Sequence, residues 1–238
     1  MPTYRLSEPV VAVFVLIPLL LTAALVWSTI EAWRRAGASR SAARRAGATM
    51  GIATAAWMAL TWAAAQSGIL RDWDRTPPPF AFLVLGVFVV SLTLSLSPVG
   101  ARISHHIPIW MLVAVQGFRL PLEIAMHALV ARGIMPVQMS YSGRNFDIVT
   151  GAAAVIVAGL VKAGYGGRRL IAAWNVLGLG LLVNVVTVAI VSTPRIRYFG
   201  DQHVVTFVTY TPFVWLPGVM VVAALAGHLV IFRALRRL

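Results

Sequence analysis

Seven apolar stretches, each about 20 residues long, constrain this chain more than any other feature of its sequence. A helix that crosses the hydrocarbon layer of a membrane needs about that many predominantly apolar residues. Only 11% of the residues are charged, whereas soluble domains carry roughly 25%. We therefore predict an all-α fold, a polytopic transmembrane bundle that forms one domain over residues 1–238. The seven predicted helices cover about residues 9–32, 49–70, 79–98, 107–132, 147–166, 170–192 and 212–232.

The basic residues predict how the bundle is oriented. The first apolar stretch is longer than the core of a secretory signal, about 7–15 residues, and a basic cluster follows it, so we expect it to be retained. One set of loops, with the C-terminus, holds Arg34, Arg35, Arg40, Arg44, Arg45, Arg102, Lys162, Arg168, Arg169, Arg233, Arg236 and Arg237. The other set holds Arg5, Arg71, Arg75, Arg132, Arg144, Arg195 and Arg197. Because the richer side faces the cytoplasm, the N-terminus is predicted outside and the C-terminus inside. The net charge is +13, and the basic residues lie between apolar runs. This placement argues for a lipid bilayer as the partner and against nucleic acid.

A polar stripe marks the fourth predicted helix. Gln116, Arg119, Glu123 and His127 fall within an arc of about 80° and extend for about 16 Å along the axis. A charge near the middle of the membrane costs at least about 2.5–3.5 kcal/mol, so the stripe should face the bundle interior. The i,i+4 spacing predicts an ion pair between Arg119 and Glu123. Pro121 should bend the helix within the stripe.

Further polar residues are candidates to complete a site with this stripe. The segment 133–146 and the segment 193–211 form the two long external loops, and each is long enough to cover a pocket mouth. At the end of the first loop, Arg144 and Asn145 are expected to fold inward, while Asp147 either caps the next helix or joins the site. Asn184 lies near mid-membrane and is a candidate for the pocket.

For two more polar residues, a role in helix packing is an alternative to a role in the site. Asn175 is expected to make an interhelical hydrogen bond. His228 either reaches the pocket from the cytoplasmic side or bonds a backbone carbonyl. A metal site built from Glu123, His127 and His228 is a weaker alternative, because the histidine spacing is not typical of zinc sites.

Several chemistries have no support in the sequence. The chain has no cysteine, and it lacks the P-loop, dinucleotide-binding, zinc-protease and serine-hydrolase motifs. Seven helices are shared with the retinal-binding rhodopsins, but the last helix here has no lysine to hold retinal. The signature of the seven-helix sugar porters is also absent. No cofactor is indicated.

The second half of the chain resembles a family of bacterial multi-spanning membrane proteins that has no assigned activity. The resemblance is carried by the following residues: Gln116, Arg119, Glu123, Gly143-Arg144-Asn145-Phe146-Asp147, Gly151, Trp174-Asn175, Gly178 and His228-Leu229. It implies that the polar set recurs in such proteins. With the strong preference for Arg over Lys, it places the chain in a bacterial cytoplasmic (inner) membrane.

The function expected from these patterns is binding or transport of a small polar or anionic solute. An outward-facing cavity would be lined by Gln116, Arg119, Glu123, His127 and Asn184 and covered by residues 133–146. One alternative is an intramembrane enzyme that acts on a lipid or lipid-linked substrate through acid–base groups Glu123, His127 and Asp147. A second is a structural or sensory subunit in which the stripe serves packing. The sequence identifies neither the ligand nor the oligomeric state.

Overall fold

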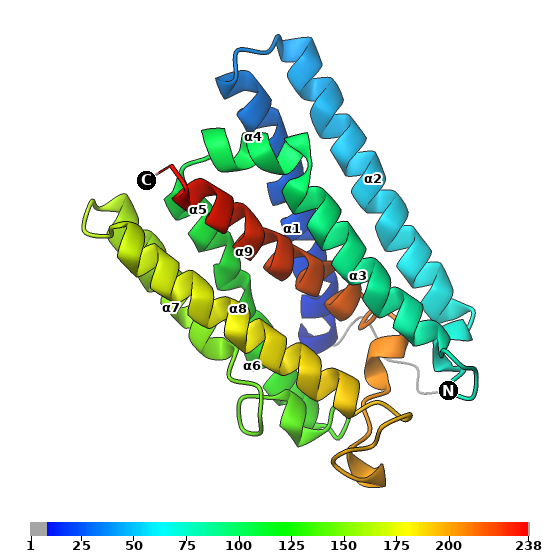
Figure 1. Ribbon diagram of the computed structural model, residues 1–238. Coiled ribbons are helices and arrows are strands. Elements are labelled where there is room, and N and C mark those ends of the chain that lie inside the picture. Colours follow the sequence, from blue (N-terminus) through cyan, green and yellow to red (C-terminus); the bar gives the residue numbers. More distant parts are fainter. Residues whose placement is uncertain (1–8, 238) are drawn as a thin grey trace.

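The computed structural model describes residues 9–237, and in this part of the chain the regular elements are all helices, joined by loops, without a strand (Figure 1). The bounds of the α-helices are α1 Pro9–Arg35, α2 Arg40–Gln66, α3 Pro79–Leu96, α4 Pro98–His106, α5 Ile109–Val115, α6 Arg119–Ala131, α7 Ile148–Lys162, α8 Arg168–Val191 and α9 Val222–Leu235. A 3-10 turn, Gln116–Phe118, joins α5 to α6, and a π-helical segment, Leu216–Val221, leads into α9. Arg5, which entered the orientation argument, lies outside the described residues.

Each of the seven predicted stretches is largely helical, and six of the resulting helices are long and apolar enough to cross a membrane. The exception is α7, which has 15 residues and is therefore only about 22 Å long. The hydrocarbon layer is about 30 Å thick, so α7 alone does not span it. The multi-pass helical fold is confirmed, whereas the seventh crossing stays a prediction.

Two helix boundaries differ from the prediction because caps, rather than hydropathy, set them. α2 begins at Arg40 and not near residue 49, since the Ser39 side chain accepts a hydrogen bond from the Ala42 backbone N–H. The short helix α4 was not predicted. Ser97 caps it by accepting from the Gly100 N–H, and Pro98 occupies the first helical position.

Helical geometry is irregular next to a proline in two places, one of them at Pro121, where the sequence predicted a bend. The 3-10 turn Gln116–Phe118 comes just before Pro121, which has no N–H to continue the helical ladder. The π-helical segment contains Pro217 and Gly218, and the Trp57 indole of α2 donates to the Gly218 carbonyl over 2.6 Å. This hydrogen bond ties α2 to the start of α9.

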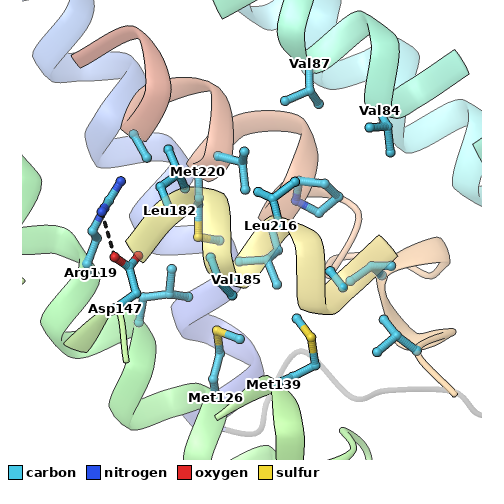
Figure 2. Close-up of a pocket in the computed structure, with 18 of the residues that line it drawn as sticks. Val84, Val87, Arg119, Met126, Met139, Asp147, Leu182, Val185, Leu216 and Met220 are labelled. Carbon is cyan, nitrogen blue, oxygen red and sulfur yellow. Dashed lines mark hydrogen bonds and ion pairs between the residues drawn. The ribbon is translucent and has the colours of Figure 1, made fainter. Parts of the chain in front are cut away.

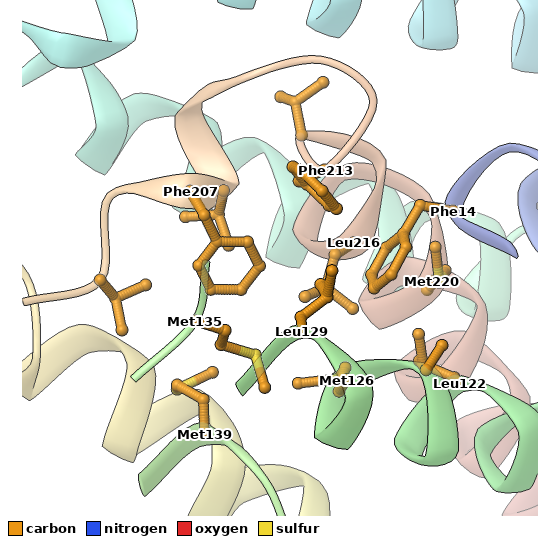
Figure 3. Packing of buried hydrophobic residues seen from close by; sticks show 14 of the residues in the cluster. Phe14, Leu122, Met126, Leu129, Met135, Met139, Phe207, Phe213, Leu216 and Met220 are labelled. Carbon is orange, nitrogen blue, oxygen red and sulfur yellow. The ribbon is translucent and has the colours of Figure 1, made fainter. Parts of the chain in front are cut away.

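α9 with its π-helical segment is the most enclosed of the six long helices. α3, α4, α5 and α8 all pack against it. α2 lies at the edge of the bundle and packs on α1, which also contacts α4 and α6 (Figure 1). Near the end that holds the two long loops, aromatic and methionine side chains fill the interior (Figure 3). Val205, Phe207 and Val208 belong to this cluster, so the loop 193–211 folds over the bundle and contributes to its core.

α6 and α7 approach one another closely at Gly151. A Cβ atom there would overlap the backbone nitrogen of Leu120, whereas a Cβ at Gly159, further along α7, meets nothing within 4 Å. The glycine at 151 therefore brings the N-terminal end of α7 against the first turn of α6.

We predict that Gly151→Ala destabilises the protein by about 1–3 kcal/mol, since the added methyl group forces backbone displacement. Gly159→Ala is the matched control on the same helix and should be neutral or stabilising by about 0.5–1 kcal/mol. Thermal unfolding midpoints in detergent micelles measure both. Equal midpoints for the two variants would contradict the close approach.

Candidate functional site

The guanidinium of Arg119 is paired with Asp147, not with Glu123 as predicted. Arg119 begins α6 and is 1% exposed. Its Nη1 lies 2.7 Å from Oδ1 of Asp147 and 3.4 Å from the carbonyl oxygen of Gly178 on α8. The i,i+4 rule considers residues on a single helix. Here the close contact between α6 and α7 at Gly151 places the carboxylate of Asp147, at the start of α7, beside the arginine. The guanidinium of Arg119 thus connects α6 to the start of α7 and to α8.

The position of Asp147 decides between its two predicted roles. It precedes α7 at the N-cap position, but its side chain makes no capping hydrogen bond. The carboxylate faces Arg119 instead, and the pair is buried, with side-chain exposures of 1% and 7%. Asp147 is therefore a partner of the buried cation and not a helix cap.

Glu123 is held by an asparagine. The Asn145 Nδ2 lies 2.9 Å from each carboxylate oxygen of Glu123 and also donates to the Met139 carbonyl oxygen over 3.0 Å. The Oδ1 of Asn145 accepts from the backbone N–H of Asp147. Asn145 is completely buried. It therefore folds inward, as expected, and its amide links the Glu123 carboxylate to the backbone N–H of Asp147.

His228 and Asn175 connect α9 to α8. The His228 Nδ1 lies 2.7 Å from the Asn175 Oδ1, and the Asn175 Nδ2 donates to the His228 carbonyl over 3.1 Å. The second bond fixes the amide so that Nδ1 of the imidazole carries the proton. Both residues are fully buried. The interhelical role expected of Asn175 is confirmed, and His228 bonds a side-chain amide rather than the predicted backbone carbonyl.

A cavity of about 90 Å³ lies beside the Arg119–Asp147 pair, between α3, α6, α8 and the π-helical segment (Figure 2). Its charged lining residues are Arg119, Glu123 and Asp147, and apolar side chains make up the rest of its wall. Met139 and Val205, from the two long loops 133–146 and 193–211, also line it. The loops therefore cover this cavity, as their length suggested.

The nine predicted site residues do not line one pocket. Arg119, Glu123 and Asp147 share the cavity described above, while Gln116 lines a separate one on another side of α9. Arg144 is exposed, its guanidinium lies over the Phe199 ring, and its carbonyl accepts a hydrogen bond from Asn184.

His127 is also outside the cavity, because its ring stacks on Tyr141 at 4.5 Å and contacts the Ser142 hydroxyl. The sequence predicted one outward-facing cavity lined by Gln116, His127 and Asn184 together with the charged residues. This predicted set of lining residues is wrong. The apolar wall, including Met126, Leu182 and Met220, was not predicted, since apolar residues in a membrane protein carry no signal of a cavity.

Arg119 keeps free hydrogen-bonding capacity. Its Nε and Nη2 are buried and have no hydrogen-bond partner among the described residues. These two atoms form one edge of the planar guanidinium, which donates two parallel hydrogen bonds to an oxygen-bearing group. The site thus offers a donor pair at the edge of an apolar cavity.

Within residues 9–237, no group of three or more His, Asp or Glu side chains is arranged to hold a metal ion. Glu123, His127 and His228 are dispersed among different contacts, which contradicts the metal alternative.

Comparisons with protein families, curated proteins and solved structures gave no match. The fold therefore defines the class, an integral membrane protein with a multi-pass helical bundle. The family resemblance stays a prediction.

We predict that Asp147→Asn lowers stability by about 3–5 kcal/mol, because it removes the counter-charge of a buried guanidinium. The matched control is Asp201→Asn. Asp201 pairs with Arg197 at a similar distance, 2.8 Å, but both side chains are exposed, so the control should have little measurable effect. Thermal unfolding in detergent distinguishes the two. A wild-type midpoint for Asp147→Asn would show that the pair contributes nothing.

Proposed function

We propose that this membrane protein binds an uncharged amphiphile through a carbonyl group, which Arg119 holds at the edge of the apolar cavity. The observation that carries the proposal is the free Nε–Nη2 edge of a buried guanidinium beside a cavity whose other walls are apolar. A buried donor left unpaired costs about 1–3 kcal/mol, and more for a charged group. A ligand that supplies an oxygen acceptor recovers this cost. Transport and chemical turnover would both begin with such binding.

The local charges favour an uncharged head group over the anion that the sequence analysis also allowed. Arg119 contributes one positive charge, while Glu123 and Asp147 both line the same cavity with carboxyl groups. Asp147 already compensates the positive charge of Arg119. An anionic head group would therefore bring an uncompensated charge into a low-dielectric interior, where little water screens it. A neutral carbonyl accepts the same two hydrogen bonds without this penalty.

The arrangement of helices supports entry from the lipid. α3 and α8 both line the cavity, and in the described part of the chain each packs on α9 without packing extensively on the other. Phe88 on α3 and Val186 on α8 are partly exposed at this wall. An amphiphile placed here keeps its hydrocarbon chain in the bilayer while its head reaches Arg119.

Binding of methyl palmitate tests the proposal. We expect native mass spectrometry in detergent to show at least about tenfold tighter binding of methyl palmitate than of hexadecane, because a hydrogen bond to a charged group is worth about 1.5–3 kcal/mol. Palmitate at pH 8 should also bind at least about tenfold more weakly than the ester, given the charge already present.

Two valine variants locate the binding site. Val185→Phe fills the cavity and should abolish binding of methyl palmitate, whereas Val183→Phe, two residues away on the exposed face of α8, should not. Neither change touches the Arg119–Asp147 pair. Equal affinities for the ester and the alkane, or ester binding by Val185→Phe at the wild-type level, would refute the proposal.

We also propose the orientation predicted from the basic residues, with the α1–α2 connection in the cytoplasm and the loop 193–211 outside. These two connections lie at opposite ends of the bundle (Figure 1). The excess of Lys and Arg on the first side supports this orientation.

Cysteine labelling tests the orientation directly, because the chain has no native cysteine. Ala36 and Gln202 are both exposed. In intact bacterial spheroplasts, a membrane-impermeant maleimide should label Gln202→Cys and not Ala36→Cys, whereas both should react after lysis. The reverse pattern in intact spheroplasts would overturn the orientation.

A further inference from the structure

A second and larger cavity, of about 680 Å³, lies on another side of α9. Side chains from α1, α2, α3 and α5 line it with those of α9, and its lining contains no charged residue. Leu60 on α2 and Val89 on α3 line it and are more than half exposed, so the cavity reaches the lipid-facing surface between these helices. It is an uncharged chamber within the apolar part of the bundle.

Gln116 supplies the buried polar group of this chamber. It is 1% exposed, and its Oε1 has no hydrogen-bond partner among the described residues. Its Nε2 lies 3.5 Å from the carbonyl oxygen of Ala223, which orients the amide with the nitrogen toward α9. A Cβ atom at position 227 would overlap that nitrogen, so Gly227 is required to seat the side chain. The amide is thus held against α9 with its oxygen unpaired.

Three of the hydroxyl groups in the lining have partners of their own. Thr54 donates to the Met50 carbonyl, Ser97 donates to the Leu94 carbonyl, and Thr22 contacts the Met58 sulfur. Among the fully buried polar side-chain atoms of this lining, the one without a partner is the Oε1 of Gln116, an acceptor. This is the opposite of the Arg119 cavity, whose unpaired groups are donors.

We infer that the second cavity is a binding site for an uncharged long-chain alcohol, whose hydroxyl donates to the Oε1 of Gln116. A buried acceptor without a partner is costly, and a hydroxyl from the ligand removes that cost. The absence of charge from the lining fits a neutral molecule, and the lateral opening fits a hydrocarbon chain that arrives from the bilayer. This site does not depend on the proposed function, because α9 separates it from the Arg119 cavity.

Hexadecanol and hexadecyl methyl ether are the probes that test this inference, since they have the same chain but the ether has no proton to donate. In native mass spectrometry of the whole protein in detergent, hexadecanol should bind at least about tenfold more tightly than the ether, the difference expected for one hydrogen bond to an otherwise unpaired acceptor. Gln116→Met keeps the side-chain length and should abolish this preference. Equal binding of the two probes to the wild type, or a preference retained in Gln116→Met, would overturn the inference.

A second pair of variants locates the site without altering Gln116. Ala24 lines the chamber, while Ala23 is exposed and does not line it. Ala24→Phe should therefore reduce hexadecanol binding at least tenfold, and Ala23→Phe should leave it unchanged. Retained binding in Ala24→Phe would refute this location even if Gln116→Met failed to fold. Methyl palmitate binding should be unchanged in Ala24→Phe, which separates failure of this inference from failure of the Arg119 site.

Discussion

The buried ion pair between Arg119 and Asp147 is the interaction around which the second half of the bundle is organised. Placing a guanidinium in an apolar interior costs several kcal/mol before any partner compensates it. The compensation comes from two other helices: the carboxylate from the start of α7 and the Gly178 carbonyl from α8. Because Gly151 must be small for α7 to approach, one charge constrains the packing of α6, α7 and α8 at the same time. Arg119 also lines the cavity, although only part of its guanidinium is paired.

α9 divides the interior into two chambers of different chemistry. Successive pairs of residues along the π-helical segment and α9 line them in turn: Met220 and Val221 line the Arg119 cavity, whereas Val222 and Ala223 line the Gln116 cavity. One chamber presents unpaired N–H donors and the other an unpaired amide oxygen. Both polar groups lie within a single helical turn of each other: Gln116 begins the 3-10 segment that precedes Pro121, and Arg119 directly follows this segment. The irregular backbone thus places the Arg119 donors on one side of α9 and the Gln116 acceptor on another side of it.

Hydropathy and helical periodicity were sufficient to predict the helical class, the approximate position of each apolar segment and the burial of Gln116, Arg119 and Glu123. They did not predict which carboxylate meets Arg119, because that depends on a loop. Asp147 is 28 residues away in the chain, and its position follows from how residues 133–147 fold back on α6. The same limit explains His127 and Asn184. They were predicted to share a helical face or a membrane depth with the site, but their side chains contact Tyr141 and the Arg144 carbonyl in the loop 133–146. Cavities depend on side-chain packing across four helices, which no single-helix pattern contains.

The shortness of α7 and the polar network have a common explanation. Non-helical backbone within a membrane is tolerated only where protein buries it and satisfies its hydrogen bonds. Before α7, the Arg144 N–H donates to the Gln138 carbonyl and the Asn145 N–H to that of Ser140, while the Asn145 side chain bonds the Met139 carbonyl and the Asp147 N–H. These bonds replace the helical ladder that α7 lacks at this end. Asn145 therefore stabilises a folded-back loop and also positions the two carboxyl groups around Arg119. The polar site is therefore built where a longer α7 would otherwise continue.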